Sequence, residues 1–154
     1  MTEKAQSAEM KQTYILFGVA GTSYAVPSHE VQHMEMVEGV TPVPNAPQFV
    51  EGVVFSRGQV VPVINLRARF GFERAAVNQR TRLLVVKHGA RSIGLMADEA
   101  REFITISDTS IQPPGSAIGN LSGSYLDGVA TLGERIVLIL NIREVVDTTP
   151  IAAA

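Results

Sequence analysis

Short apolar runs that contain many β-branched and aromatic residues recur along the chain, separated by glycine or proline. The first run is Tyr14-Ile15-Leu16-Phe17-Gly18-Val19, which a turn signal at 20–22 joins to Ser23-Tyr24-Ala25-Val26. Similar paired runs follow at 52–55 with 59–65, at 82–88 with 91–97, and at 126–132 with 135–140. Runs of this length, bounded by turn residues, are typical of β-hairpins. The pattern therefore predicts an all-β chain.

The segments between these hairpins predict little helix. Residues 33–38 alternate polar and apolar side chains, which predicts a half-buried strand. Ser28 is expected to cap one helical turn that runs through Gln32. We expect a strand or short turn at 66–70, a β-segment at 102–106, a terminal helix at 141–147 and an irregular stretch at 112–123. Ordered structure should begin at Thr13, after a flexible lead-in at 1–12, and end before a flexible tail at 148–154.

The two halves of the chain are related in sequence. Residues 51–67 align with 127–143 without a gap, with glycine, asparagine and arginine at matching positions. Upstream, Ile15-Leu16-Phe17 aligns with Leu83-Leu84-Val85, and His29-Glu30-Val31 aligns with Asp98-Glu99-Ala100. A long unit that occurs only twice predicts two similar β-lobes rather than a solenoid. The lobes would lie mainly at 13–80 and 81–147, and strands may be exchanged at their boundary.

One strand predicts how the lobes pack. Residues 136–140 are Ile-Val-Leu-Ile-Leu, with no polar alternation. A strand that is apolar on both faces is expected to be covered on both faces. We infer that it lies between the lobes and contributes to one shared core. Pro62, within a predicted strand, indicates a sheet edge or a bulge because proline cannot donate to the ladder.

Composition narrows the class of function. The chain has 154 residues, of which 45% are hydrophobic and 18% charged, and its formal net charge is −2. This balance permits a sizeable core and lacks the basic character of a nucleic-acid binder. The chain contains no cysteine, which excludes disulfides and thiolate chemistry. No run approaches the roughly 20 apolar residues that a membrane-spanning helix needs, so we expect a cytoplasmic protein without membrane insertion.

The segment His29-Glu30-Val31-Gln32-His33 matches the H-E-x-x-H pattern of zinc peptidases. That chemistry needs both histidines on one face of a sustained helix, together with a third ligand. The sequence predicts only one helical turn here, and no downstream motif supplies the third ligand. No other catalytic motif is present, so we expect no catalytic residues, no metal and no cofactor. A zinc peptidase remains the alternative, and a small-ligand barrel is a third hypothesis with little support.

Two features favour a surface that binds a partner. Arg57 lies in the tight Ser56-Arg57-Gly58 turn, where it is either a solvated arginine or a contact to a partner's carboxylates or carbonyls. Val31, Met34 and Met36 form an apolar series that either packs in the core or provides an adaptable floor for an amphipathic helix.

Two longer motifs carry a family resemblance. The segment 57–67 contains the pattern R-G-x-[IV]-[IV]-P-[IV], and Tyr125-Leu126-Asp127-Gly128-Val129 leads into the second hairpin and Asn141-Ile142. Together with 14–26, Val31-Gln32 with Met34, 45–49 and 51–53, these motifs resemble the CheW adaptors of bacterial chemosensory arrays. The resemblance covers roughly Thr13 to Val146.

The resemblance implies two small five-stranded SH3-like β-barrels around a shared apolar core, with no enzymatic activity. It implies two partners, the regulatory domain of a CheA-type histidine kinase and the hairpin tip of a chemoreceptor coiled coil. The protein would then act in the cytoplasm beneath membrane-anchored receptor arrays. The groove residues that match by position are Val31, Gly52, Arg57 and Gly58, and the neighbouring His33 and Met34 complete the predicted receptor-binding set. The kinase-binding residues stay unassigned.

The chain departs from the family pattern at two places. The family usually has an acidic residue where this chain has His33, and it reads N-L-R-G where this chain has Phe55-Ser56-Arg57-Gly58. Both departures lie near the expected receptor groove. They suggest the hypothesis that this adaptor serves a divergent receptor or a pathway other than flagellar swimming.

Overall fold

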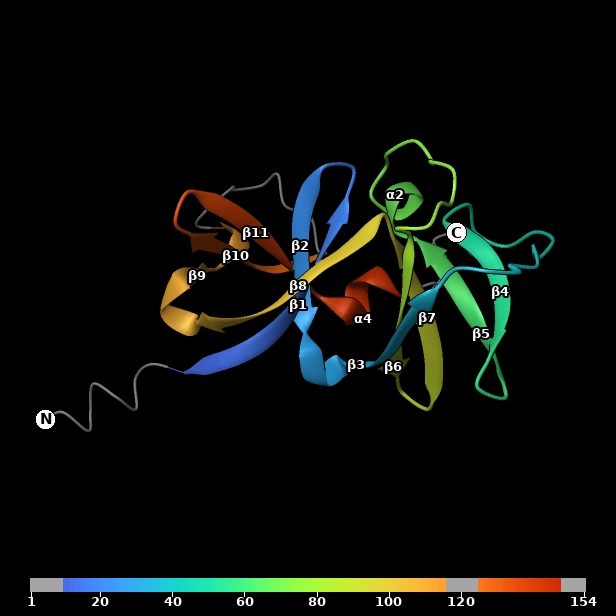
Figure 1. Ribbon diagram of the computed structural model, residues 1–154, viewed down its shortest axis with the longest axis horizontal. Helices are drawn as coiled ribbons and strands as arrows, with labels where there is room; N and C mark the ends of the chain where they lie inside the picture. The colour runs from blue at the N-terminus through green and yellow to red at the C-terminus, as the bar shows by residue number, and fades with distance from the viewer. Residues whose placement is uncertain (1–9, 116–124, 148–154) are drawn as a thin grey trace, which may run out of the picture.

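The computed structural model describes residues 10–115 and 125–147, and most of this part of the chain is β-strand (Figure 1). The first-half elements are β1 (Lys11–Val19), β2 (Thr22–Pro27), η1 (Ser28–Glu30), β3 (Val31–Met36), β4 (Val50–Ser56), β5 (Gln59–Asn65) and α2 (Leu66–Arg69). The second-half elements are β6 (Arg82–His88), β7 (Arg91–Ala97), β8 (Glu99–Ser107), η2 (Asp108–Ser110), β9 (Ile111–Gln112), β10 (Leu126–Leu132), β11 (Arg135–Leu140) and α4 (Ile142–Val145). The prediction of an all-β chain is confirmed.

The strands form two sheets that lie side by side in Figure 1. One has six strands in the order β8-β1-β2-β11-β10-β9, and the other has five in the order β3-β6-β7-β5-β4. The outer strands of each sheet do not pair with one another in the described part of the chain, so the expected closed five-stranded barrels are open sheets instead. At one edge of the six-stranded sheet, β9 has only two residues, and a single bridge from Thr41 to Val53 extends the edge of the other sheet at β4.

The two halves of the chain exchange strands. The first hairpin, β1–β2, joins the sheet built by β8 to β11, and the hairpin β6–β7 joins the sheet built by β3 to β5. Parallel pairing makes both connections, β2 with β11 and β5 with β7. A lobe boundary at residue 80 would therefore assign β6 and β7 to the second lobe, although they lie in one sheet with β3, β4 and β5. Each sheet needs strands from both halves of the chain.

The repeat has a different register from the one that the sequence alignment indicates. Ile15 corresponds to Leu84, because both belong to the core between the sheets, whereas Leu83 belongs to the core of the five-stranded sheet. The alignment matched Gly21 with Gly89, but Gly21 is the second residue of its turn and Gly89 is the first. A shift of one residue moves a strand's side chains to the opposite face, so the correction decides which residues are equivalent.

Three apolar clusters hold the sheets together. The inter-sheet core contains Ile15, Phe17, Val19, Tyr24, Val26, Ile64, Leu66, Leu84, Val86, Ile93, Leu95, Ala97, Leu140, Ile142, Val145 and Val146. Each sheet also encloses a smaller cluster of its own. In β11, Val137 and Ile139 point into the six-stranded sheet's cluster, while Leu138 and Leu140 pack on the inter-sheet core. Coverage on both faces is therefore confirmed for this strand, except at Ile136, which is 60% exposed.

The short helices α2 and α4 are capped by equivalent asparagines, which the sequence did not lead us to expect. Oδ1 of Asn65 accepts the Ala68 amide at 3.1 Å, and its Nδ2 donates to Glu51 at 2.9 Å. The same contacts join Asn141 to the Glu144 amide at 3.1 Å and to Asp127 at 2.9 Å. A side-chain oxygen at the N-cap satisfies an amide that has no partner within the helix. Residues 66–69 are therefore helical, and not a strand.

Smaller differences concern the ends of elements. The first strand begins at Lys11 rather than Thr13. Ser28 does not cap a turn through Gln32; it opens the three-residue 3₁₀ element η1, which has no side-chain cap. Pro62 lies in the part of β5 that pairs with β4, before β5 begins to pair with β7. This position agrees with the absence of a backbone N–H donor in proline. Residues 1–9, 148–154 and most of the predicted loop at 112–123 lie outside the described residues. Within the described part of the chain, no helix is long and apolar enough to cross a membrane.

Candidate functional site

The tip of the β4–β5 hairpin presents a cation beside two apolar side chains. Arg57 and Gly58 form the turn, with φ angles of 49° and 82°. Phe55 pairs with Val60 just before the turn, and these side chains are 76% and 63% exposed. Arginine and aromatic residues are enriched in protein interfaces, and exposed apolar side chains next to one another favour partner binding.

Arg57 adopts a backbone conformation that suits glycine better than arginine. Its φ of 49° lies in the left-handed region, which costs a residue with a Cβ about 1–2 kcal/mol. In the related β10–β11 hairpin, the same position holds Gly133, with a φ of 66°. Strain of this kind is often retained at functional sites. The turn at Arg57 is therefore strained where the equivalent turn at Gly133 is not.

Next to this turn, three polar side chains form one cluster. Nε2 of His33 lies 2.7 Å from Oε2 of Glu35 and 3.3 Å from Oγ of Ser56. Ser56 donates its hydroxyl hydrogen to the same Glu35 oxygen at 2.6 Å. Because the carboxylate only accepts hydrogen bonds, Nε2 of His33 carries a hydrogen toward Glu35. We call these three residues the β3–β4 polar cluster.

A cavity of about 260 Å³ opens between the β3–β4 polar cluster and the hairpin turn. Its lining residues are Gln32, His33, Ser56, Arg57, Gln59, Val61, Val85 and Ser92. Ser92 donates to Oε1 of Gln32 at 2.8 Å, which ties β7 to β3 at this place. The cavity therefore brings two of the predicted receptor-binding residues, His33 and Arg57, to one surface.

The remaining predicted residues take other positions. A bulge between Val31 and His33 turns both Val31 and Met34 toward the inter-sheet core, where they pack as partly buried side chains. Gly52 is buried, and a Cβ there would overlap the carbonyl oxygen of Thr41. The packed residues beneath the site are therefore Val31, Met34 and Gly52. The residues that line or border its surface are His33, Arg57 and Gly58.

The H-E-x-x-H segment does not form the helix that zinc peptidases use. His29 and Glu30 belong to the three-residue η1, and His33 belongs to strand β3. Nδ1 of His29 pairs with Nε2 of Gln12 at 3.3 Å, while His33 turns toward Glu35. The two imidazoles have different partners on different elements. Among the described residues, no group of three potential metal-ligating side chains comes together.

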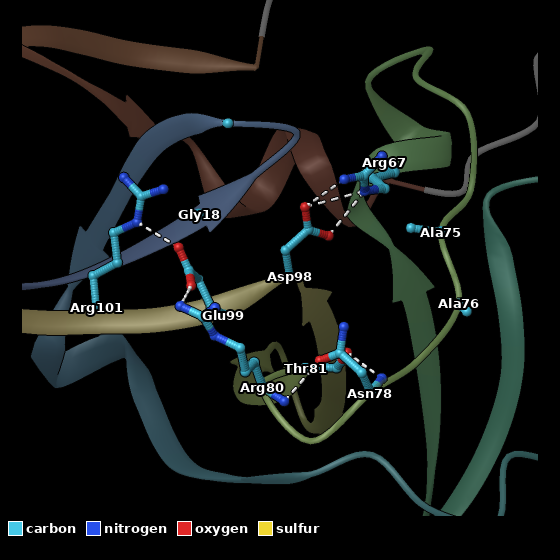
Figure 2. Close-up of a pocket in the computed structure, with 11 residues that line it drawn as sticks. Gly18, Arg67, Ala75, Ala76, Asn78, Arg80, Thr81, Asp98, Glu99 and Arg101 are labelled. Carbon is cyan, nitrogen blue, oxygen red and sulfur yellow. Dashed lines mark hydrogen bonds and ion pairs between the residues drawn. The ribbon is translucent and has the colours of Figure 1, made fainter.

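A second polar cavity of about 260 Å³ lies where the two sheets meet (Figure 2). Asp98 accepts from Nε and Nη2 of Arg67, with contacts between 2.8 and 3.1 Å, and from the Ala20 amide at 2.8 Å. Burial raises the pKa of Asp98, but the hydrogen bonds from Arg67 and Ala20 and the charge of Arg67 outweigh it, so the pKa lies below the ordinary value of 3.8. With every strong donor of the site already engaged, this ion pair is structural.

Glu35 is a member of the site that the sequence analysis missed. The signal was present, because residues 33 and 35 of an alternating strand share one face, and both are polar here. Ser56 drew attention only as a departure from the family pattern. What the sequence does not reveal is that this serine lies between His33 and Glu35.

The fold and the site define a class of protein before any comparison. Two β-sheets share one core, and in the described part of the chain the polar side chains form ion pairs, caps and small surface clusters rather than a catalytic constellation. These features define an all-β module of two sheets with exposed apolar side chains at one hairpin tip.

Comparison with known proteins agrees with this class. The CheW-like domain family matches residues 13–149. The chain is 34% identical over 143 residues to the chemotaxis protein CheW of Helicobacter pylori, covering 92% of this chain and 86% of that protein. It is 30% identical over 146 residues to the protein FrzA of Myxococcus xanthus, covering 94% and 91% of the two chains. The crystal structure of the scaffolding protein TtCheW from Thermoanaerobacter tengcongensis matches with a TM-score of 0.83 and 25% identity, over 91% of this chain and 95% of that chain. The chain belongs to the CheW-like domain family, and it is a chemotaxis scaffold rather than an enzyme.

Proposed function

We propose that this protein couples the regulatory domain of a CheA-type histidine kinase to the cytoplasmic hairpin tip of a chemoreceptor, beneath membrane-anchored receptor arrays. Family membership supports the coupling role, and the surface around Arg57 supports a receptor contact. The single observation that carries the receptor assignment is the strained Arg57, which replaces a glycine of the related hairpin and lines a cavity with His33. The receptor-binding set is Val31, His33, Met34, Gly52, Arg57 and Gly58, of which the first, third and fourth act by holding the others in place.

A charge reversal at the hairpin tip tests the receptor contact. We expect Arg57→Glu to fold normally, because the side chain is exposed, and to weaken binding of the purified cytoplasmic fragment of a receptor from the same organism by at least tenfold. Isothermal titration calorimetry measures the affinity. Lys11→Glu is the matched control, since it reverses an exposed charge at the start of β1, in the other sheet. Unchanged affinity in folded Arg57→Glu would defeat the assignment.

The kinase arm needs its own experiment, because no residue of this chain is assigned to it. The tagged native protein should retain a histidine kinase from its own cytosol, which mass spectrometry would identify. Absence of any histidine kinase from the retained proteins would contradict the coupling role. Arg57→Glu should retain the kinase as well as the native chain does, which separates the two binding surfaces.

The two departures from the family pattern favour a receptor that differs from the common type. His33 introduces an imidazole where the family has a carboxylate, and Phe55 introduces an exposed ring where the family has an amide. We expect the native protein to bind a receptor tip of the common type more weakly than its cognate tip. Equal affinities for the two tips would count against a divergent receptor.

A further inference from the structure

Two polar cavities lie along the seam between the sheets, and the internal repeat relates them. The first seam cavity is the one that contains Arg67 and Asp98 (Figure 2). The second seam cavity, of about 530 Å³, is lined by Glu30, Lys87, His88, Gly89, Asp127, Asn141, Ile142 and Arg143. In Figure 1, the tip of the β1–β2 hairpin and α2 lie at the top of the seam, whereas η1 and the tip of the β6–β7 hairpin lie at the bottom. The two cavities therefore sit at opposite ends of the seam between the sheets.

The donors of the first seam cavity have counterparts in the second. Arg67 and Arg143 are each the second residue of a short helix, α2 or α4. Ala20 and Gly89 are each the first turn residue after β1 or β6. The arginine and the backbone amide that hold Asp98 in the first seam cavity thus recur as Arg143 and Gly89.

The acceptor does not recur. Ala100 of β8 pairs with Phe17, and Val31 of β3 pairs with Val86, which occupies the place of Phe17 in the related hairpin. Asp98 lies two residues before Ala100, and His29 lies two residues before Val31. His29 therefore occupies the position that Asp98 has in the related structure. The His29 side chain is 67% exposed and turns to Gln12 and Glu30, and it offers no carboxylate.

The donors of the second seam cavity consequently face solvent. Within residues 10–115 and 125–147, neither the Arg143 guanidinium nor the Gly89 amide has a hydrogen-bond acceptor, and Lys87 and His88 line the same cavity without an ionic partner. Two carboxylates are also present: Asp127 accepts from Asn141 at 2.9 Å, and Glu30 lies 3.8 Å from His29. Glu99, the counterpart of Glu30, lines the first seam cavity, and Glu51, the counterpart of Asp127, accepts from Asn65. Asp98 binds Arg67 all the same.

We propose that the second seam cavity binds a carboxylate of a partner, an aspartate or glutamate side chain in an acidic peptide segment. The Arg143 guanidinium and the Gly89 amide would hold it as Arg67 and the Ala20 amide hold Asp98. Charge-assisted hydrogen bonds from arginine and backbone amides are the usual means of recognising carboxylates. The site is separate from the Arg57 surface and goes beyond the proposed coupling role.

Nuclear magnetic resonance tests the site without either signalling partner. In the native chain, titration with sodium acetate at constant ionic strength should shift the Gly89 amide and the Arg143 Nε–Hε signals to saturation, with a midpoint on the order of 10 mM. The Ala20 amide and the Arg67 Nε–Hε signals serve as internal controls, since Asp98 already occupies them, and they should not move. A capped Gly-Gly-Asp-Gly-Gly peptide should bind about tenfold more tightly than acetate if the natural ligand is a protein side chain, and with equal strength if it is a free carboxylate. The matched peptide with asparagine should not bind.

Two variants make the outcome decisive. Arg143→Gln should abolish the response to acetate. His29→Asp should also abolish it, because the new carboxylate would occupy the donors as Asp98 does in the first seam cavity. A response that persists in either folded variant, equal shifts at Arg67 and Arg143, or no shift in the native chain would overturn the proposal.

Discussion

Nε2 of His33 lies 3.3 Å from Oγ of Ser56, although the two residues are 23 positions apart, and these are places where the chain departs from its family's pattern. The two side chains therefore belong to one hydrogen-bonded cluster with Glu35. An acidic residue at 33 would face Glu35 across the serine, whereas histidine can donate to Glu35 and serine can donate to it as well. In the polar cluster, both His33 and Ser56 thus have Glu35 as a hydrogen-bond partner at the base of the Arg57 turn.

Restoring the family's acidic residue alone should therefore destabilise the protein. In His33→Glu, two carboxylates would compete for one hydroxyl, and we expect the free energy of unfolding to fall by about 1–2 kcal/mol. Urea denaturation measures the change. Adding Glu35→Gln should recover most of the loss, because it removes the repulsion. Full stability of His33→Glu, or no recovery in the double variant, would show that the contact between His33 and Glu35 carries no energy.

The equivalent caps Asn65 and Asn141 should differ in their contribution. Both make the same two contacts, but Asn65 is 1% exposed, whereas Asn141 is only half-buried. We expect Asn65→Ala to lower the free energy of unfolding by about 2–3 kcal/mol, because it leaves buried groups unpaired, and Asn141→Ala by about 1 kcal/mol. Chemical denaturation of both variants under the same conditions gives the comparison. A larger loss for Asn141→Ala would contradict this ranking.

The fold was predictable from the sequence where it depends on local pattern. Alternation, turn residues and the gapless repeat from 51 to 67 gave the hairpins and the relation between the halves. Which hairpins are exchanged between the two sheets was not predictable, because hydrophobic periodicity does not say which sheet a hairpin joins. The one-residue shift between Ile15 and Leu84 was missed because the glycines of the two turns occupy different turn positions.

Local sequence pattern also predicted the position of some residues of the candidate site. Arg57 was predicted at the tip of a hairpin because a glycine-containing turn marks such a tip, and the structure has Arg57 in that turn. Val31 and Met34 were expected at a groove, but the bulge after Val31 points both toward the core, and single bulges leave no trace in the periodicity. The contact from His33 to Ser56 joins β3 and β4, the two outer strands of the five-stranded sheet, which do not pair and which only the tertiary structure brings together.

Two glycines of the predicted receptor-binding set should respond differently to alanine. A Cβ at Gly52 would overlap the Thr41 backbone, whereas nothing lies within 4 Å of a Cβ at Gly58. We expect Gly52→Ala to cost about 3 kcal/mol or more and Gly58→Ala about 1 kcal/mol, the latter from its left-handed φ alone. Thermal unfolding followed by circular dichroism separates these values. Comparable losses would mean that the backbone moves away from residue 52 without cost.

The ion pair between Arg67 and Asp98 should make stability depend on pH in acid. The pKa of Asp98 is lowered in the folded state, so its contribution is fully present above the unfolded value of 3.8 and is lost as the pH falls through the folded value. Asp98→Asn should lower the free energy of unfolding by about 1.5–3 kcal/mol at pH 7. The difference between native chain and variant should shrink below about pH 4. A difference that stays constant from pH 7 to pH 3 would exclude Asp98 as the source.

Arg57 should show a conflict between stability and binding. Arg57→Gly removes the strain of a left-handed residue, as Gly133 does in the related turn, so we expect it to raise the free energy of unfolding by about 1 kcal/mol. Arg57→Ala keeps a Cβ and hence the strain, so its stability should match that of the native chain. Both variants lose the guanidinium, and both should weaken binding of the receptor fragment. Urea denaturation and calorimetric titration of the same preparations give the two readouts. If Arg57→Gly gained stability without losing affinity, the arginine would serve no partner, and if it gained neither, the turn would not be strained.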